Sequence, residues 1–157
     1  MTASVVGLKV PEFILPGTGG EFKLSGHAGK PLVLYFYPRD NTPGCTTEAG
    51  QFRDLHSELV RFGCAVYGIS RDNIKSHEGF KAKLGLPFDL LSDTDEMACA
   101  LFDVIRKKKL YGKDVRGIER SSFLIDADGY LACEWRGVKV DGHAAEVLKA
   151  VEQLQQP

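Results

Sequence analysis

Residues 31–45 have the sequence PLVLYFYPRDNTPGC, which places the central strand of the predicted fold. Positions 31–37 are apolar without polar alternation, a pattern typical of a strand that is covered on both faces. The strand should end at Pro38, because proline has no N–H to donate to a sheet ladder. A loop from Arg39 to Gly44 follows, and Cys45 then stands at the start of a predicted helix.

The residues on either side predict alternating strands and helices. After Cys45, apolar residues recur at the three-to-four spacing of an amphipathic helix, which Gly63 closes. The remaining strands are expected at residues 13–15, 21–24, 64–70, 88–91, 121–125 and 130–135. The remaining helices are expected from an N-cap at Asp72 to about Leu84, from a cap at Asp93 or Thr94 to about Phe102, and over residues 145–154. This order predicts an α/β fold with a mixed β-sheet flanked by helices.

The chain has 157 residues and a formal net charge of −1, from 20 basic and 21 acidic side chains. We expect residues 1–157 to form a single domain, because a domain contains on the order of 150 residues. Without a basic excess, the chain is not expected to bind nucleic acid or a membrane surface. Its longest apolar run is far shorter than the roughly 20 residues that span a bilayer, and no signal-peptide pattern is present. We therefore expect a cytoplasmic location.

The cysteines and histidines do not predict a metal site. The four cysteines are scattered and include no CxxC pair, so neither a disulfide scaffold nor a zinc site is expected. The four histidines show no ligand spacing, and we expect surface or capping roles for them at His27, His56, His77 and His143. The basic run at 106–109 is expected to be a solvated loop.

Cys45 is placed where a thiol becomes reactive. It follows the carboxyl end of a strand, where open α/β sheets bind ligands, and it begins a helix, whose unpaired N–H groups and dipole favour the thiolate. Thr42 lies three residues earlier, and the turn at Pro43-Gly44 could aim its hydroxyl and the N–H groups of Gly44 and Cys45 at one point. An ordinary loop that leads into a helix with a buried cysteine would have the same local sequence.

The segment from Tyr35 to Ala49 strongly resembles the active-site segment of the peroxiredoxins. It contains their Pro-x-x-x-Thr-x-x-Cys motif at Pro38, Thr42 and Cys45. The Thr-Pro-Gly-Cys-Thr-x-Glu form, the segment 90–93 and the segment 120–126 are similar to the PrxQ, or bacterioferritin comigratory protein, branch. The resemblance extends from about Val10 to Leu154. It implies a thioredoxin-like fold and the thiol-dependent reduction of hydrogen peroxide and alkyl hydroperoxides.

The resemblance also implies a role for each site residue. Cys45 would be the peroxidatic cysteine, Thr42 would hydrogen-bond the peroxide, and Pro38 would shield the sulfur from water. Arg120 would stabilise the thiolate and the transition state, because a guanidinium is always charged and donates several hydrogen bonds. Glu48 would orient Arg120, although a carboxylate one turn into a helix could equally serve the helix start. No metal, haem or flavin is implied.

The oxidised Cys45 needs a second thiol, and the sequence does not supply an obvious one. Many members of the branch carry the resolving cysteine five residues after the peroxidatic one, where this chain has Gly50. Cys64 should lie at the opposite sheet edge and Cys133 in the core, which leaves Cys99 as the internal candidate. We favour a 1-Cys mechanism, in which thioredoxin, glutaredoxin or a small thiol resolves Cys45.

Two other functions remain open at this point. One is a thioredoxin-like disulfide reductase, which the missing CxxC motif disfavours. The other is a redox sensor that uses oxidation of Cys45 to change a partner surface. We expect a monomer in each case.

Overall fold

A computed structural model describes residues 4–155. Its centre is β3 (Leu32–Phe36), in which all five residues are buried. This strand pairs in parallel with β4 (Ala65–Ser70) and antiparallel with β8 (Ser121–Ile125). The central strand expected from its apolar sequence is therefore confirmed.

The other strands extend this sheet on both sides in the order β2-β1-β5-β4-β3-β8-β9. On one side β5 (Leu90–Ser92) pairs in parallel with β4, and the hairpin of β1 (Ile14–Gly17) and β2 (Gly20–Lys23) adds to it antiparallel. On the other side β9 (Leu131–Arg136) pairs antiparallel with β8. The sheet is mixed, as expected.

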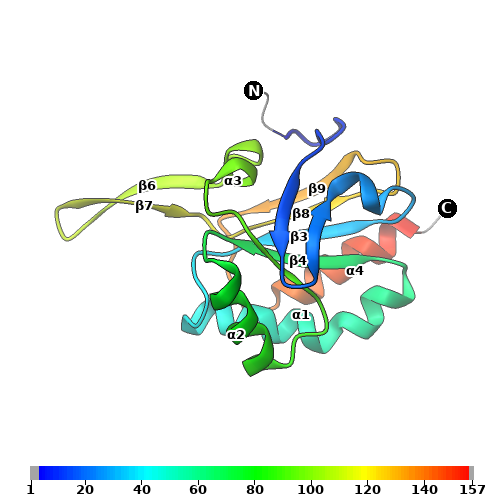
Figure 1. The fold of residues 1–157 in the computed structure, drawn as a ribbon. Coiled ribbons are helices and arrows are strands. Elements are labelled where there is room, and N and C mark those ends of the chain that lie inside the picture. Colours follow the sequence, from blue (N-terminus) through cyan, green and yellow to red (C-terminus); the bar gives the residue numbers. More distant parts are fainter. Residues whose placement is uncertain (1–3, 156–157) are drawn as a thin grey trace.

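Helices cover both faces of the sheet unequally (Figure 1). Three long helices, α1 (Pro43–Arg61), α2 (Ile74–Leu84) and α4 (His143–Gln155), lie against one face. The short helix α3 (Met97–Leu101) packs on the other face, and η1 (Leu24–His27) follows β2. The mixed sheet with flanking helices confirms the predicted α/β class. No helix within residues 4–155 is both long and apolar enough to cross a membrane.

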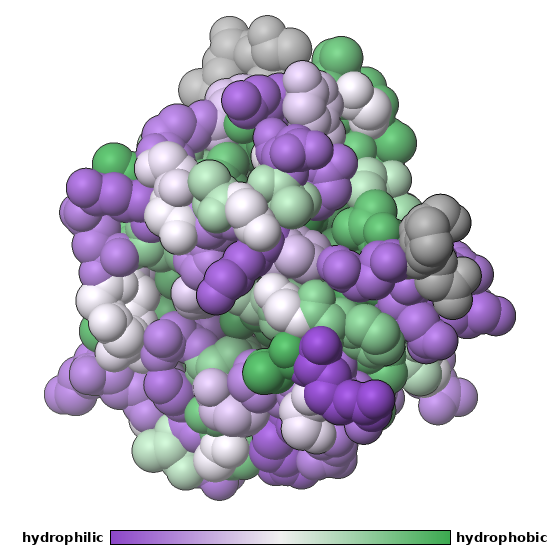
Figure 2. Space-filling model, turned by 90° about the vertical axis from the view of Figure 1, so that its right-hand side faces the viewer, coloured by the Kyte–Doolittle hydropathy of each residue, from purple (hydrophilic) through white to green (hydrophobic). Residues whose placement is uncertain are grey.

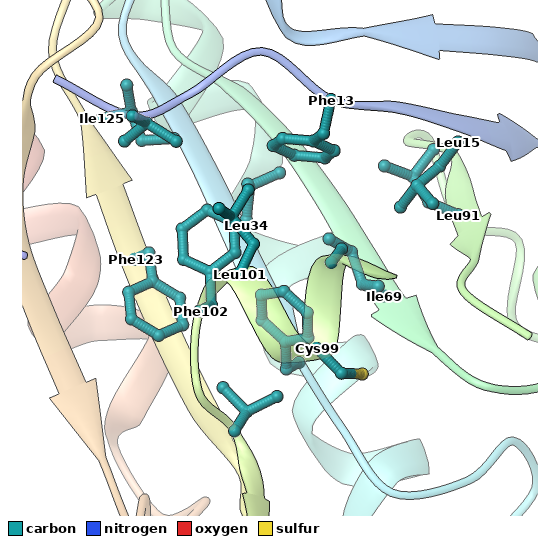
Figure 3. Packing of buried hydrophobic residues seen from close by; sticks show 14 of the residues in the cluster. Phe13, Leu15, Leu34, Ile69, Leu91, Cys99, Leu101, Phe102, Phe123 and Ile125 are labelled. Carbon is teal, nitrogen blue, oxygen red and sulfur yellow. The ribbon is translucent and has the colours of Figure 1, made fainter. Parts of the chain in front are cut away.

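Alternate residues of β3 divide the interior into two cores. Leu34 and Phe36 enter a cluster that also contains Cys99, and Figure 3 shows Leu34, Phe102, Phe123 and Cys99 in this cluster. Val33 and Tyr35 enter a second cluster, under the three long helices, which contains Cys45. The sheet therefore separates Cys45 from Cys99.

Two predicted helix starts are wrong. Asn73, not Asp72, is the N-cap of α2, and its side chain accepts a hydrogen bond from the Ser76 N–H at 2.8 Å. The helix α3 begins at Met97, later than a cap at Asp93 or Thr94 would place it. The Asp93 carboxylate nevertheless accepts hydrogen bonds from the Ala98 and Cys99 N–H groups, so it stabilises this helix start from a distance.

The basic run is not a loop. Residues 106–109 lie in β6 (Ile105–Leu110), which pairs with β7 (Lys113–Ile118) in a ribbon that projects from the body (Figure 1). Arg116 in β7 forms an ion pair with Glu96, which connects the ribbon to the start of α3, and Arg71, just after β4, pairs with the same carboxylate. The run is solvated, as expected, but it is a strand.

The surface prediction for the histidines fails at two positions. His77 and His143 are buried, whereas His27 and His56 are partly exposed. Both buried rings have polar partners, since His77 lies against Asp40 and His143 lies 2.8 Å from the Ser122 hydroxyl. A hydrogen-bonded imidazole can be buried without the cost of an unpaired polar group.

The end of the sheet at which β3 begins is hollowed. A cavity of 510 Å³ is lined there by residues that include Lys30, Leu32 and Ile125. Figure 2, which faces this end, shows a largely hydrophilic surface with scattered hydrophobic side chains. Cys45 follows the opposite end of β3, so this cavity is not part of the site described next.

Candidate functional site

The segment between β3 and α1 is shaped by three residue types. Asn41 adopts a left-handed conformation with φ of 65°, which asparagine tolerates better than most residues. Thr42 is the extended N-cap, and Pro43 occupies the first helical turn, where its fixed φ suits the helix and no N–H is needed. The chain therefore turns sharply from the end of the central strand into α1.

Cys45 lies in the first turn of α1, and its side chain is only 2% exposed. The first N–H groups of an α-helix have no partner within the helix, so they face the space in front of the first turn. This space is favourable for negative charge because the positive end of the helix dipole adds to the N–H groups. The sequence prediction of a cysteine at a helix start is confirmed.

Arg120 reaches Cys45 from the segment between β7 and β8. Its Nη2 donates to the Cys45 Sγ at 3.5 Å, and its Nη1 donates to the Glu48 Oε1 at 2.6 Å. One guanidinium thus contacts two residues that lie about one helical turn apart. A Cβ atom on Gly44 would stand 3.1 Å from Nη2, so the absent side chain at Gly44 leaves room for this approach.

Glu48 is completely buried beneath Arg120. Burial raises its pKa to about 7 from the ordinary value of 4.5, although Arg120 acts in the opposite direction. Its Oε2 has no hydrogen-bond partner within residues 4–155. The raised pKa means that Glu48 destabilises the fold progressively as the pH rises from about 4.5 through about 7. Glu48 thus contacts Arg120, as an orienting residue would, and its role stays a prediction.

Thr42 and Pro38 lie on the solvent side of the segment. The Thr42 hydroxyl donates to the Arg39 carbonyl at 2.9 Å, so its oxygen lone pairs remain free to accept a hydrogen bond. Pro38 is exposed just after β3. The roles of Thr42 toward peroxide and of Pro38 as a shield stay predictions.

The other three cysteines lie elsewhere. Cys64 is buried before β4, and burial raises its pKa to about 12. Burial also raises the pKa of Cys99, on the far side of the sheet, and of the half-buried Cys133 in β9. Cys133 packs against the same core as Cys45, whereas a register shift in β9 puts Leu131 into the other core.

The chain is similar to known proteins over most of its length. The model of the AhpC/TSA family matches residues 6–133. A putative peroxiredoxin bcp of Coxiella burnetii is 51% identical over 144 residues, which cover 91% of this chain and 95% of that protein. The chain belongs to the peroxiredoxin family. The peroxiredoxin Bcp of Bacillus subtilis is 48% identical over 150 residues, with 95% and 96% of the two chains covered.

Solved peroxiredoxins have the same fold. A structure of the Xanthomonas campestris bacterioferritin comigratory protein superposes with a TM-score of 0.91 at 46% identity, over 97% of this chain and all of that one. The thioredoxin-like fold and the PrxQ/Bcp relationship that the sequence implied are confirmed. As a peroxiredoxin, the chain is an enzyme, a thiol peroxidase whose substrates are peroxides and whose reductant is a thiol.

Sequence reasoning missed two features of this peroxiredoxin's site. The space that Gly44 leaves for Arg120 could not be seen, because the two residues are distant in sequence. The buried contact between His77 and Asp40, in the segment before Thr42, was also missed. Its only signal was the presence of an acid in that segment and a histidine in an amphipathic helix, which is weak evidence for contact.

Proposed function

We propose that this peroxiredoxin reduces hydrogen peroxide and alkyl hydroperoxides at Cys45 and that a thiol from outside the chain resolves the oxidised sulfur. The observation that carries the proposal is the contact of the Arg120 Nη2 with the Cys45 Sγ at 3.5 Å. The X. campestris relative supports the choice of substrate, since its trapped intermediate and ligand complexes address an alkyl peroxide reduction activity.

In the first step, the Cys45 thiolate attacks one peroxide oxygen. A sulfur–oxygen bond forms, the oxygen–oxygen bond breaks, and the leaving oxygen takes a proton and departs as water or alcohol. The sulfur loses two electrons and becomes a sulfenic acid. Arg120 and the N–H groups of the first turn stabilise the negative charge as it moves from sulfur to the leaving oxygen. Thr42 accepts a hydrogen bond from the peroxide and so fixes its orientation, while Pro38 limits access of water.

In the second step, an external thiolate attacks the Cys45 sulfur, a sulfur–sulfur bond forms, the sulfur–oxygen bond breaks, and the oxygen takes up a proton and leaves as water. A second thiol then attacks the mixed disulfide, which releases a disulfide and restores the Cys45 thiolate. External resolution is supported by the positions of Cys99 and Cys64 and by the residue at position 50. Cys99 lies across the sheet, Cys64 precedes β4 at the other sheet end, and Gly50 replaces the branch's frequent resolving cysteine.

The reductant in this proposal is thioredoxin, glutaredoxin or a small thiol in the cytoplasm. All four cysteines, which lie within the described part of the chain, are free. Free thiols are typical of a reducing compartment, where such reductants are abundant. The absence of a CxxC motif also argues against a disulfide reductase, which would need a second thiol beside Cys45.

One equivalent of hydrogen peroxide is expected to leave Cys45 as a sulfenic acid that dimedone labels, in a chain without an intramolecular disulfide. A small thiol should then form a mixed disulfide at Cys45, and excess peroxide should produce the sulfinic acid, because no local thiol competes. Intact and peptide mass spectrometry measure all three products. A disulfide between Cys45 and Cys99 or Cys133 would contradict external resolution without contradicting peroxidase activity.

Gly50→Cys provides the matched comparison for that experiment. A Cβ at Gly50 would stand 3.6 Å from the Arg53 side chain, an ordinary contact, so the variant should fold. After oxidation it should trap Cys45 as a disulfide at the expense of dimedone labelling. The first turns of α1 must unwind for this, because residues five apart in a helix rise about 7.5 Å and a disulfide requires Cα atoms within about 7 Å.

Thr42→Val is expected to lower the second-order rate constant with peroxide by about 10²-fold, as for loss of one hydrogen bond made in the transition state. The valine retains the volume of threonine but cannot accept a hydrogen bond from the peroxide. Stopped-flow kinetics under single turnover measure this rate. Thr47→Val is the control, because the Thr47 hydroxyl also donates to a backbone carbonyl but is exposed one turn further along α1. Equal rates for Thr42→Val and the wild type would show that Thr42 does not take part in the reaction with peroxide.

A further inference from the structure

A buried hydrogen-bond network surrounds Asp40, in the segment that connects β3 to α1. The Asp40 Oδ1 accepts from the Tyr37 hydroxyl at 2.6 Å. Its Oδ2 lies 2.7 Å from the His77 Nδ1 and accepts from the Ser76 hydroxyl at 2.8 Å. The side chains of His77 and Asp40 are 0% and 1% exposed. This is the most buried ion-pairing geometry outside the Cys45 site within residues 4–155.

Both ring nitrogens of His77 have partners within the protein. Its Nε2 lies 2.9 Å from the Leu91 carbonyl, which can only accept, so Nε2 carries a proton. Hydrogen bonds from His77, Tyr37 and Ser76 outweigh burial and hold the pKa of Asp40 below its ordinary value, so Asp40 is a carboxylate. The His77 Nδ1 faces this carboxylate, so His77 bridges Asp40 and β5 through its two ring nitrogens.

The same residues do not form a metal site. Asp40, Asp72 and His77 offer ligand atoms within 4.8 Å of one another. However, both nitrogens of His77 are occupied by protein acceptors, and the Asp72 Oδ2 already accepts from the Asp40 N–H and the Ser70 hydroxyl. A cation would have to displace protons from a satisfied network. We interpret the cluster as an internal clamp on the segment.

The location of this clamp gives it a function. Asp40 immediately precedes Asn41, whose left-handed backbone starts the turn into α1, and Thr42 and Cys45 follow. Through His77 the segment is fastened to α2 and to β5, and through Asp72 it is fastened to the end of β4. We propose that Asp40 and His77 are positioning residues, which hold the start of α1 so that Thr42 and Cys45 meet one peroxide molecule. The kinetic part of this proposal rests on the function proposed for Cys45.

A positioning role predicts opposite changes in two reactivities of Cys45. Reaction with peroxide needs Thr42, Arg120 and the sulfur in the correct relative positions, because small misplacements of reacting groups lower the rate strongly. Alkylation by iodoacetamide needs only access to a sulfur that is 2% exposed in the folded site. Loosening the clamp should therefore slow the reaction with peroxide and speed alkylation.

Asp40→Asn and His77→Gln test the clamp. The first replaces the carboxylate that faces His77 by an amide, and the second replaces the ring whose two nitrogens bridge Asp40 and Leu91. Each variant should react with peroxide about tenfold more slowly or worse, and be alkylated severalfold faster. Amide hydrogen exchange of residues 41–48 should accelerate. The double variant should react with peroxide no more slowly than the slower single variant, because two residues that act as one unit have non-additive effects.

Tyr37→Phe and Ser76→Ala are milder variants that keep the proposal testable if Asp40→Asn or His77→Gln does not fold. Each removes one hydrogen bond to Asp40 but keeps the His77 ion pair, so each should show a smaller shift in the same two directions. His27→Gln is the matched control. His27 also makes a side-chain bond, to the Tyr67 hydroxyl at 3.1 Å, but it lies near the other end of the sheet. Its peroxide rate should change less than about twofold, because distant sites act independently.

Peroxide and alkylation rates together distinguish a positioning role from a structural or an electrostatic one. A lower melting temperature with unchanged peroxide and alkylation rates would show a purely structural role and overturn the proposal. A parallel fall of both rates would show a loss of thiolate rather than of position, and would also overturn it. If wild-type Cys45 itself does not react with peroxide, the function proposed for Cys45 fails. Alkylation and hydrogen exchange would then still confirm or refute the clamp.

Discussion

Cys45→Ser is expected to abolish peroxide turnover, with a loss of at least about 10³-fold in any thiol-coupled assay. Serine differs from cysteine by one atom and fits the space around Cys45, a residue that is 2% exposed, so the fold should be retained. Its hydroxyl is hardly ionised at neutral pH, even at a helix start beside Arg120, and an alcohol is a poor nucleophile toward a peroxide oxygen. Peroxide consumption with dithiothreitol or thioredoxin and its reductase is the measurement.

Cys133→Ser is the control for this result. Cys133 packs against the same core as Cys45 but is half-buried in β9, and burial raises its pKa. The control should keep turnover with a small thiol close to that of the wild type. Turnover that survives in Cys45→Ser, or disappears in Cys133→Ser, would contradict the assignment of Cys45 as the reactive cysteine.

Arg120→Met is expected to slow the reaction with peroxide by about 10²-fold or more, the effect of losing a charged donor to the transition state. The sequence alone suggests little change in packing, but the structure adds an effect on Glu48. Arg120 opposes the rise in the pKa of Glu48, so its removal raises that pKa further above about 7. Glu48 will then be neutral at pH 7, and no charge is left buried without a partner.

The stability of Arg120→Met should therefore depend on pH. A carboxyl group whose pKa is raised in the folded state makes the fold more stable at low pH than at high pH. This stabilisation is lost as the pH rises from about 4.5 through the raised pKa of Glu48, so the variant should be less stable in alkaline buffer. The double variant with Glu48→Gln removes this dependence, yet should remain as slow as Arg120→Met. Arg120→Lys should also be slow, because an ammonium cannot donate in a fixed fork to both Glu48 and Cys45. Wild-type rates in a folded Arg120→Met would exclude the arginine from the reaction.

The fold was largely predictable because its strands carry strong local patterns. The run 31–37 is apolar throughout, and the helix after it repeats at helical spacing, so burial and periodicity agree. The ribbon of β6 and β7 was missed for the opposite reason. Its strands bury little and contain successive lysines, which are rare in strands, so no apolar alternation distinguished them from a loop.

The site was predictable only in part. The start of α1 follows from Pro43 and Gly44, but Arg120 is 75 residues away from Cys45, and only the family resemblance connected them. His77 is 37 residues away from Asp40, and its burial depends on that partner. Local sequence does not encode such pairings, because the positions of both residues are set by how the strands are ordered in the sheet.

The distribution of the cysteines determines how the molecule tolerates damage. Cys64 and Cys99 are buried, Cys133 is half-buried, and burial raises the pKa of all three thiols, so Cys45 is the one thiol expected to react readily with an excess of oxidant. A sulfinate at Cys45 would add its negative charge at a helix N-terminus beside a guanidinium, where an anion is stabilised. An inactivated chain should consequently keep its shape and solubility, and the cell would lose a catalyst without gaining an aggregate.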